Sequence, residues 1–363
     1  MEKINSKQLI ESANTVVIKA GSTVVCNGSG ADAEAIACIV KMAKTLAARG
    51  KKAAIVTSGA VATGKTAKKD GKGDRASLSA IGQAQVIGEF SNAAARNGTQ
   101  IGQVLVSQGD FGKDGGKTIS KAIENVIDAG VIPVINENDA VYSGGAKFFH
   151  DNDDLASQLG TLLGAEVLVM LSNVDGVIDK DAKAVIPVVY DADAALENDY
   201  GTCNGLGGLK AKIKAAKAFV QNGGKAAIIA SGRTAGGGLP ISFRDGATCT
   251  IFPSKELTAE LLAGQVKSAK STSKEIARIV AKKGGSAIAT ALRGIALSLE
   301  KNAEKIANAN GEDAKKGEEK ISKAMLQRLS FDKAAVEKTA EKIRKLAAFP
   351  DPLAFSEKMT GTN

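Results

Sequence analysis

TVVIKAGST, residues 15–23, begins with apolar residues of which several are β-branched, as in strands buried on both faces of a parallel sheet. Five further runs of this kind occur, at residues 52–58, 103–107, 131–136, 166–172 and 225–231. Helical patterns such as residues 33–50 separate them, as crossover connections between parallel strands require. We therefore predict an α/β fold, a three-layer α/β/α sandwich with a mainly parallel, doubly wound central sheet.

The chain has 363 residues, more than twice the roughly 150 expected of a typical domain. After ATCTIFPSK at residues 247–255, strand patterns give way to Ala, Lys, Glu and Leu at helical spacing. We predict an α/β domain over residues 1–252 and a helical segment over residues 253–363. The first part carries 27 Lys and Arg against 25 Asp and Glu, a charge of +2, and the second 21 against 14, a charge of +7. Helices with interleaved Glu are typical of solvated faces, so we expect no nucleic-acid partner.

Four widely spaced cysteines form no CxxC pair, which favours reduced thiols over a disulfide framework or a thiolate metal site. The sequence has no apolar run of about 18 residues and no secretory leader pattern, so we expect a cytoplasmic protein without a membrane partner. Aromatic residues are only 4% of the chain, which argues against an aromatic stacking platform for single-stranded nucleic acid.

The segment GAVATGKT, residues 59–66, has the spacing of a phosphate-binding P-loop and follows a predicted strand. In that interpretation Lys65 would bind phosphate. The segment contains few glycines for an open backbone nest, so an ordinary connection from strand to helix is the alternative. A second lysine, Lys19, precedes a Gly-Ser turn and suits phosphate oxygens, although a solvated lysine in a tight turn would have the same sequence.

Further polar segments follow later predicted strands. INEND at residues 135–139 offers two amides and two carboxylates, either for a small polar ligand or for a simple turn. FHDNDDL at residues 149–155 concentrates carboxylates that need cations or donors, or else it begins a helix with an acidic cap. Its His150 is the only histidine of the chain, which excludes a site with two histidine ligands, and we expect it to be a bystander. CNGLGGLKAKIKAAKA at residues 203–218 is either an anion site at a helix N-terminus or a basic solvated face, with Lys210, Lys212 and Lys214.

In their order along the chain, VVIKAGST, IVTSGAVATGK, VIPVINENDAV, HDNDDLAS, LVMLSNVDGV and GLGGLKAKIKAA resemble the amino acid kinase family, and within it the glutamate 5-kinases. Residues 305–352 resemble the N-terminal helices of γ-glutamyl phosphate reductase, and a kinase followed by a reductase is the layout of the pyrroline-5-carboxylate synthases. The reductase resemblance includes neither a nicotinamide site nor a catalytic cysteine. We therefore expect no reductase activity on this chain.

The resemblance implies transfer of the γ-phosphoryl group of ATP to the side-chain carboxylate of L-glutamate, with Mg²⁺ held through phosphates and water and not by a protein metal site. It implies that Lys19 and Lys212 stabilise the transferring phosphoryl group while Asp153 orients both lysines. The glutamate site it implies consists of Ser58, Gly59, Asn136, Asp139, Asp151 and Asn152. The nucleotide site it implies consists of Lys19, Gly21, Ser22, Ser172, Asn173, Gly207, Gly208 and Lys212, with the amides of Gly21 and Ser22 assisting.

One departure from the family pattern concerns Asn173, which stands in LSNVDG where the family commonly has an aspartate. The loss of that charge bears on the nucleotide site, and a weakened kinase is one interpretation. Two further alternatives stay open at this point: a kinase with another acceptor, or a kinase-like scaffold whose helical segment assembles oligomers or filaments. The resemblance also implies a homo-oligomer.

Overall fold

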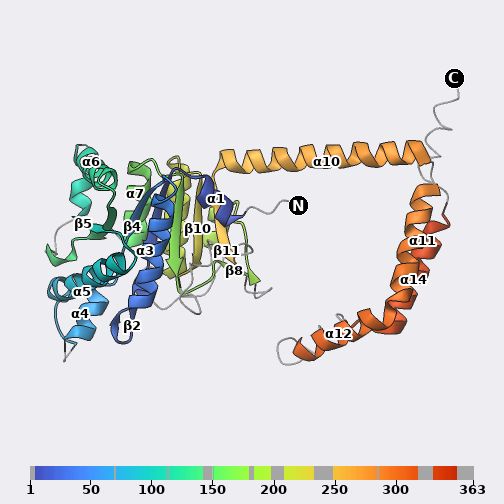
Figure 1. Ribbon diagram of the computed structural model, residues 1–363, viewed down its shortest axis with the longest axis horizontal. Coiled ribbons are helices and arrows are strands. Elements are labelled where there is room, and N and C mark those ends of the chain that lie inside the picture. Colours follow the sequence, from blue (N-terminus) through green and yellow to red (C-terminus); the bar gives the residue numbers. More distant parts are fainter. Residues whose placement is uncertain are drawn as a thin grey trace, which may run out of the picture. The chain divides into compact units, whose positions relative to one another are not determined.

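The computed structural model describes residues 5–68, 71–112, 114–141, 149, 151–179, 184–197, 208–232, 248–283, 286–317 and 330–349. Contacts between residues divide the chain into two compact units, Met1–Ala263 and Gly264–Asn363. The first unit contains every strand of the described residues, and the second is helical (Figure 1). None of the helices in the described ranges is long and apolar enough to cross a membrane.

A seven-stranded sheet forms the centre of the first unit, in the order β11-β10-β7-β1-β4-β6-β5. All neighbouring pairs are parallel except β10 and β11, which are antiparallel. The chain runs from β1 to β4, β5 and β6 on one side and later to β7, β10 and β11 on the other, so β1 lies where the strand order reverses. The strands are β1 Thr15–Ala20, β4 Lys52–Val56, β5 Ile101–Val106, β6 Ile132–Glu137, β7 Val167–Ser172, β10 Ala226–Ser231 and β11 Cys249–Pro253.

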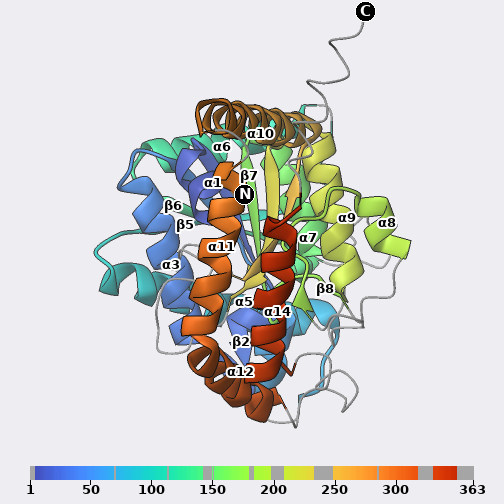
Figure 2. The ribbon, with the colours of Figure 1, turned by 90° about the vertical axis from the view of Figure 1, so that its right-hand side faces the viewer.

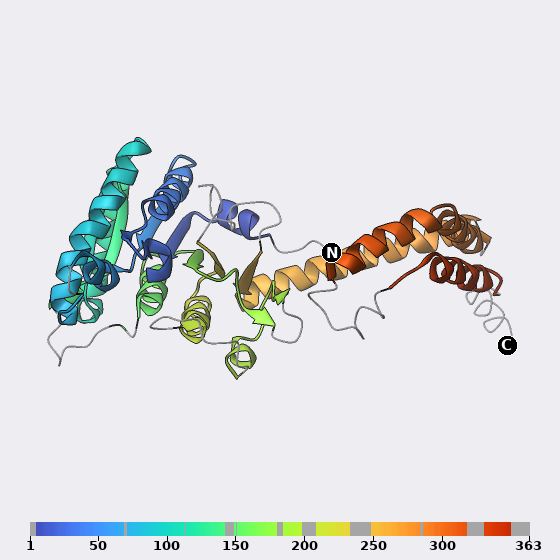
Figure 3. The ribbon, with the colours of Figure 1, turned by 90° about the horizontal axis from the view of Figure 1, so that it is seen from below.

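Helices cover both faces of this sheet, because alternate residues of each strand point to opposite faces. On β1, Val16 and Ile18 pack in one apolar cluster with α3 and α5, whereas Val17 packs in a second cluster with α6, α7 and α9. Figures 2 and 3 show α3 and α9 on opposite sides of the sheet. The helices are α3 Ala33–Ala47, α5 Arg75–Arg96, α6 Gly115–Asp128, α7 Asn152–Leu162 and α9 Gly208–Gln221.

Shorter elements complete the first unit. Two small antiparallel pairs lie outside the main sheet, β2 (Cys26–Asn27) with β3 (Gly30–Ala31) and β8 (Ile178–Asp179) with β9 (Ala184–Val185). The remaining helical pieces are α1 Ser6–Ser12, α2 Ser22–Val25, α4 Ala60–Ala67, the 3-10 turns η1 Gln108–Phe111 and η2 Asp139–Val141, and α8 Ala192–Glu197.

The predicted fold class is confirmed, and all six predicted strands are present within two residues of their expected bounds. One strand of the seven-stranded sheet was missed: β11, which forms the antiparallel edge and whose apolar run CTIFP is short and close to the change in composition. The two-residue strands β2, β3, β8 and β9 were not predicted either. It ends at Pro253, and α10 (Lys255–Lys283) begins two residues later. The domain boundary at residues 252 and 253 stays a prediction.

The second unit contains α11 (Ser286–Lys301), α12 (Ala303–Gly317) and α14 (Lys333–Ala347). Small side chains pack where α14 meets α11 and α12, since Ala296, Val336 and Ala340 are fully buried. Ion pairs join the same helices, with Arg344 2.6 Å from Glu300. Such solvent-exposed pairs contribute at most about 1 kcal/mol each, so the buried alanines and valine are the main contacts holding these helices together.

Candidate active site

Four adjacent strands end at the same edge of the sheet, because β7, β1, β4 and β6 are parallel neighbours. Their carboxyl ends carry Ser172, Lys19, Ser58 and Asn136, with Ser58 two residues beyond β4. Helix α7 adds Asn152 and Asp153 from its first turn, and α9 adds Lys212. In an open α/β sheet the crevice at the reversal of strand order is the usual ligand site, which here is the end of β1.

Asp153 bridges two lysines. Its Oδ1 is 2.5 Å from the ammonium of Lys19, and its Oδ2 accepts a hydrogen bond of 2.8 Å from Lys212. The three side chains, here called the lysine–aspartate triad, are 3%, 5% and 12% exposed for Asp153, Lys19 and Lys212. The triad carries two positive charges and one negative charge in a buried setting, so it has a net charge that a further anion would compensate.

Burial and the neighbouring charges shift two pKa values in this triad. Burial lowers the pKa of Lys19, with repulsion from Lys212 acting in the same direction against the attraction of Asp153. For Asp153, burial raises the pKa, but the two ammonium groups outweigh it and hold the pKa below its ordinary value. The carboxylate therefore stays ionised at neutral pH and keeps both lysines in place.

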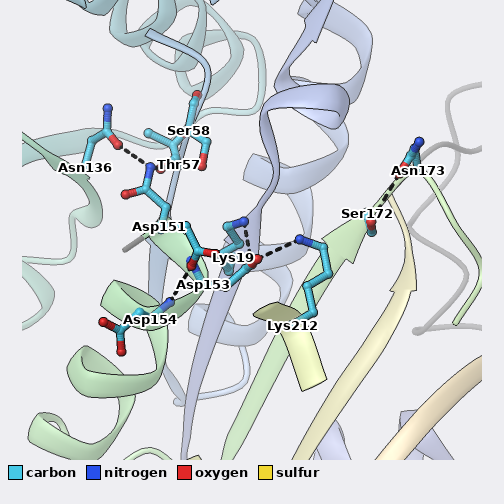
Figure 4. Close-up of polar contacts among 11 residues, drawn as sticks. Lys19, Thr57, Ser58, Asn136, Asp151, Asp153, Asp154, Ser172, Asn173 and Lys212 are labelled. Carbon is cyan, nitrogen blue, oxygen red and sulfur yellow. Dashed lines mark hydrogen bonds and ion pairs between the residues drawn. The ribbon is translucent and has the colours of Figure 1, made fainter. Parts of the chain in front are cut away.

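Figure 4 shows this triad between two groups of polar side chains: Ser58 and Asn136 on one side, Ser172 and Asn173 on the other. Both groups therefore approach the same pair of ammonium groups from opposite directions. An arrangement of this kind suits the transfer of an anionic group between two ligands, each held by one group of polar side chains.

Asn152 joins the first group. Its Nδ2 lies 3.0 Å from the carbonyl oxygen of Thr57, 3.0 Å from Ser58 Oγ and 3.0 Å from Asn136 Oδ1. Asn136 in turn donates to Gln83 Oε1 at 2.7 Å. The Oδ1 atom of Asn152 is buried, and none of the described residues donates a hydrogen bond to it. A buried acceptor without a donor is costly, so this oxygen is suited to a donor on a bound ligand.

Asp151 accounts for both interpretations of the acidic segment. Its Oδ1 accepts from the backbone N–H groups of Asp153 and Asp154, at 2.9 and 3.0 Å, and so caps α7. Asp154 points elsewhere, because its Oδ1 accepts from Gln158 one turn later. The segment is thus a helix cap that also delivers Asn152 and Asp153 to the site.

Gly59 makes the turn from β4 into α4 with a φ of 97°, which favours glycine. A Cβ there would lie 2.5 Å from the thiol sulfur of Cys26. For Gly21 the predicted role is wrong in one respect: its amide donates to the carbonyl oxygen of Leu171 at 3.1 Å and is therefore committed within the protein. Ser22 begins α2 next to it and is exposed.

These residues surround a cavity of about 300 Å³. Every predicted site residue within the described ranges lines it except Asn136, which is buried behind the cavity wall and contacts Asn152. The members it brings together are Lys19, Gly21, Ser22, Ser58, Gly59, Asp139, Asp151, Asn152, Asp153, Ser172, Asn173, Gly208 and Lys212. Gly207 and His150 lie outside the described residues.

Among the charged side chains of the cavity wall, sequence reasoning missed Arg75, and it gave Glu137 only as one of the two carboxylates of INEND and not as a member of the implied site. The Nε and Nη2 atoms of Arg75 donate to Asp139 Oδ1 at 3.1 and 2.9 Å. Glu137 accepts the backbone N–H of Phe149 at 3.0 Å, and burial raises the pKa of its carboxyl group. Glu137 stands within INEND and could have been included with its neighbours, whereas nothing in the local sequence around Arg75 marks it.

Comparison with known proteins agrees with this geometry. Residues 14–231 match the amino acid kinase family, which is more than half of the chain. The chain belongs to the amino acid kinase family. It is 32% identical over 227 residues to the glutamate 5-kinase of Syntrophus aciditrophicus, covering 59% of each chain. It is also 32% identical over 226 residues to the glutamate 5-kinase of Alkaliphilus oremlandii, covering 58% of this chain and 86% of that one.

Among solved structures, an N-acetylglutamate synthase from Neisseria gonorrhoeae, complexed with coenzyme A and N-acetyl-glutamate, superposes with a TM-score of 0.51. The two are 18% identical, and the match covers 69% of this chain and 62% of that chain. At that identity the similarity bears on the fold alone. It agrees with the α/β fold described above.

The P-loop interpretation of residues 59–66 is wrong. In a P-loop the Gly-Lys pair stands where the loop enters the helix, so that backbone N–H groups face phosphate. Here α4 begins at Ala60, directly after Gly59, and Lys65 lies in its last turn. The backbone N–H groups of the segment are therefore largely committed to helix hydrogen bonds, as in the alternative of an ordinary strand-to-helix connection.

A further feature of the described residues is the distribution of their metal-ligating side chains. Among the residues that the structure describes, no group of three or more His, Cys, Asp or Glu side chains could hold a metal ion. On the side of the triad that Ser172 and Asn173 occupy in Figure 4, Ser172 Oγ lies 3.4 Å from Asn173 Oδ1, so residue 173 contributes an amide and not a carboxylate.

Proposed function

We propose that this chain phosphorylates the side-chain carboxylate of L-glutamate with ATP, producing γ-glutamyl phosphate and ADP as the first step of proline biosynthesis. The curated relatives named above are glutamate 5-kinases, and the chain spans 59% of the length of one and 86% of the other. The observation that carries the proposal is the lysine–aspartate triad, which sets two ammonium groups between two polar subsites.

The reaction needs charge neutralisation more than it needs a base. A glutamate carboxylate is already ionised at neutral pH, so one of its oxygens attacks the γ-phosphorus while the bond from that phosphorus to the β–γ bridging oxygen breaks. No proton has to move. Two anions must approach each other, and we infer that Lys19 and Lys212 stabilise the charge that builds up on the transferring phosphoryl group. Asp153 positions both ammonium groups for this role.

The glutamate subsite, in this proposal, consists of Ser58, Gly59, Asn136, Asp139, Asp151 and Asn152. The unpartnered Oδ1 of Asn152 supports the assignment, because an amino acid brings N–H donors. Asn136 acts through Asn152, since it lies behind the cavity wall.

The nucleotide subsite consists of Ser22, Ser172, Asn173, Gly208 and Lys212 in the same proposal, with Gly21 giving close approach of the backbone. Lys212 would contact both nucleotide and transferring group. Mg²⁺, when bound, neutralises the triphosphate, and phosphate oxygens and water fit it better here than protein carboxylates do. Asn173 removes one negative charge from this subsite relative to the aspartate common in the family.

The remaining expectations are part of the same proposal: a cytoplasmic homo-oligomer, a domain of residues 1–252, and a helical segment over residues 253–363 related to the start of γ-glutamyl phosphate reductase, as in a pyrroline-5-carboxylate synthase. One observation favours a scaffold role for that segment as a second function. Its helices expose large apolar side chains at 50% to 58%, among them Leu262, Val266, Ile295 and Leu346. Loss of oligomers on removal of residues 264–363, measured by light scattering, would support that role.

The test of the proposed reaction is formation of γ-glutamyl hydroxamate from glutamate, hydroxylamine, ATP and Mg²⁺, with acetylglutamate and aspartate as alternative acceptors. Product with glutamate and no more than a trace with the others is the expected result. Lys19→Met provides the matched negative control, because it removes the ammonium and keeps the side-chain length. No product from any acceptor with folded protein would refute the proposal.

A further inference from the structure

One ion pair in the cavity wall lies outside the lysine–aspartate triad. The guanidinium of Arg75 donates twice to Asp139 Oδ1, at 3.1 and 2.9 Å, and both residues line the cavity. Asp139 is 9% exposed as a side chain, whereas Arg75 is 47% exposed and so lies on the open side of the pair. The pair joins α5 to η2 through two residues that are 64 positions apart in the chain.

The position of Arg75 is unfavourable for its own helix. It is the first residue of α5, directly after the cap Asp74. A helix N-terminus carries a partial positive charge, so a cation there is disfavoured and an acidic residue is preferred. Arg75 therefore does not stabilise the helix that it begins, and its position is better explained by a role in the cavity that it lines.

The charges of the cavity match those of an α-amino acid. The lysine–aspartate triad supplies positive charge where phosphoryl transfer takes place, and Arg75 with Asp139 supplies one cation and one anion beside the glutamate subsite. A free amino acid carries an α-carboxylate and an α-ammonium on one carbon atom. A guanidinium can pair with the α-carboxylate while a carboxylate pairs with the α-ammonium. Each charge of the protein pair then has an opposite charge on the ligand, so no charge is left unbalanced.

We propose that Arg75 binds the α-carboxylate of the acceptor while Asp139 binds its α-ammonium, so that this pair selects a free α-amino acid. The inference rests on the proposed function. An acceptor that lacks one of the two α-groups would leave either Arg75 or Asp139 without an opposite charge. Binding of such an acceptor is disfavoured for that reason. Lys65 also lines the cavity and adds positive charge to it.

Two analogues of glutamate separate these roles. Glutarate keeps both carboxylates and lacks the α-ammonium, and 4-aminobutyrate keeps the ammonium and lacks the α-carboxylate. The experiment measures KM for glutamate and inhibition constants for both analogues, in the wild type, Arg75→Gln and Arg75→Lys. Arg96→Gln is the matched control, because Arg96 is an exposed arginine in the last turn of the same helix.

We expect Arg75→Gln to raise KM for glutamate about 10- to 100-fold with kcat changed less than about threefold, as loss of a charged hydrogen bond made in both ground and transition states predicts. Glutarate should weaken similarly. The inhibition constant of 4-aminobutyrate should stay the same or fall, because Asp139 loses its competitor. Arg75→Lys should restore part of the loss, and Arg96→Gln should match the wild type.

Equal weakening of glutamate and 4-aminobutyrate would overturn the inference, since a merely structural link between α5 and η2 would affect both ligands alike. An unchanged KM in Arg75→Gln would overturn it as well. Calorimetric titration of glutamate, which needs no turnover, keeps the two proposals distinguishable. If glutamate binding depends on Arg75 but no phosphorylation occurs, the proposed reaction is refuted and the role of Arg75 stands. If phosphorylation occurs and does not depend on Arg75, the role of Arg75 is refuted and the proposed reaction stands.

Discussion

Replacing Asp153 by asparagine removes the one negative charge that holds Lys19 and Lys212 together. The carboxylate is 3% exposed and lies 2.5 and 2.8 Å from the two ammonium groups. Removal of one partner from a buried ion pair costs about 3–5 kcal/mol. Lys212 is 12% exposed and partly screened by solvent, so we expect about 3 kcal/mol, which corresponds to a fall in Tm of about 6–12 °C for a unit of this size.

The measurement is thermal unfolding followed by circular dichroism, with Asp154→Asn as the control. Asp154 is the next residue of the same helix. Its carboxylate accepts a hydrogen bond from Gln158 and points away from the triad. Its replacement should change the free energy of unfolding by about 0.5 kcal/mol or less. Added sulfate or phosphate should recover part of the loss in Asp153→Asn, because an anion between the ammonium groups replaces the missing charge. Equal losses in both variants would refute the reasoning.

The pH dependence gives a second test. The pKa of Asp153 is held below its ordinary value, so its stabilisation is complete above about pH 4 and is lost as pH falls through the lowered pKa. Burial lowers the pKa of Lys19, so the unfolded chain binds more protons than the folded chain between that lowered pKa and about 10.4. Stability therefore rises with pH in that window.

Without the carboxylate, the pKa of Lys19 falls further. The pH range over which stability rises with pH therefore extends further toward neutral pH in Asp153→Asn. The difference in Tm between the wild type and Asp153→Asn should consequently shrink from about pH 7 to about pH 9.5. A difference that is constant over this range would show that the loss has another origin than the unpaired ammonium.

Three further predictions concern turnover, packing and nucleotide binding. Lys19→Met and Lys212→Met should each lower kcat about 10²- to 10³-fold in the hydroxamate assay, as loss of transition-state charge stabilisation predicts, with far-UV circular dichroism unchanged; wild-type kcat in either would remove its role. Gly82→Ala should lower the free energy of unfolding in urea by about 3 kcal/mol, because its Cβ would lie 1.9 Å from a backbone carbonyl oxygen of α4. Gly88→Ala in the same helix is the control: its Cβ meets nothing within 4 Å, so it should raise the free energy of unfolding by about 0.5–1 kcal/mol. Asn173→Asp should lower KM for ATP, and an unchanged value would show that the lost charge is immaterial.

The fold could be predicted from sequence because each parallel strand is a short, strongly apolar run with clear bounds. β11 escaped because CTIFP is only five residues long and includes a threonine and a proline, which shorten its apolar run. The polar strand ends of β1, β4, β6 and β7 were also readable, since parallel strands place their carboxyl ends at one edge.

Arg75 could not be found in this way. Its contact with Asp139 spans 64 residues and depends on how α5 packs beside η2, which no local pattern encodes. The committed amide of Gly21 is similar, because its acceptor is the carbonyl oxygen of Leu171 on the neighbouring strand. Both depend on register and packing between elements distant in the chain.

The sequence by itself determined the class of fold, the order of its strands along the chain and the residue types available at the strand ends, since apolar periodicity and strand-end polarity are local properties of the chain. Only the tertiary structure decided which charges meet. It placed Asp153 between Lys19 and Lys212, gave Asn136 a supporting position behind Asn152, and paired Arg75 with Asp139. Coulombic and hydrogen-bond partners depend on distances of a few ångströms across the sheet, and those distances exist only once the strands have paired and the helices have packed.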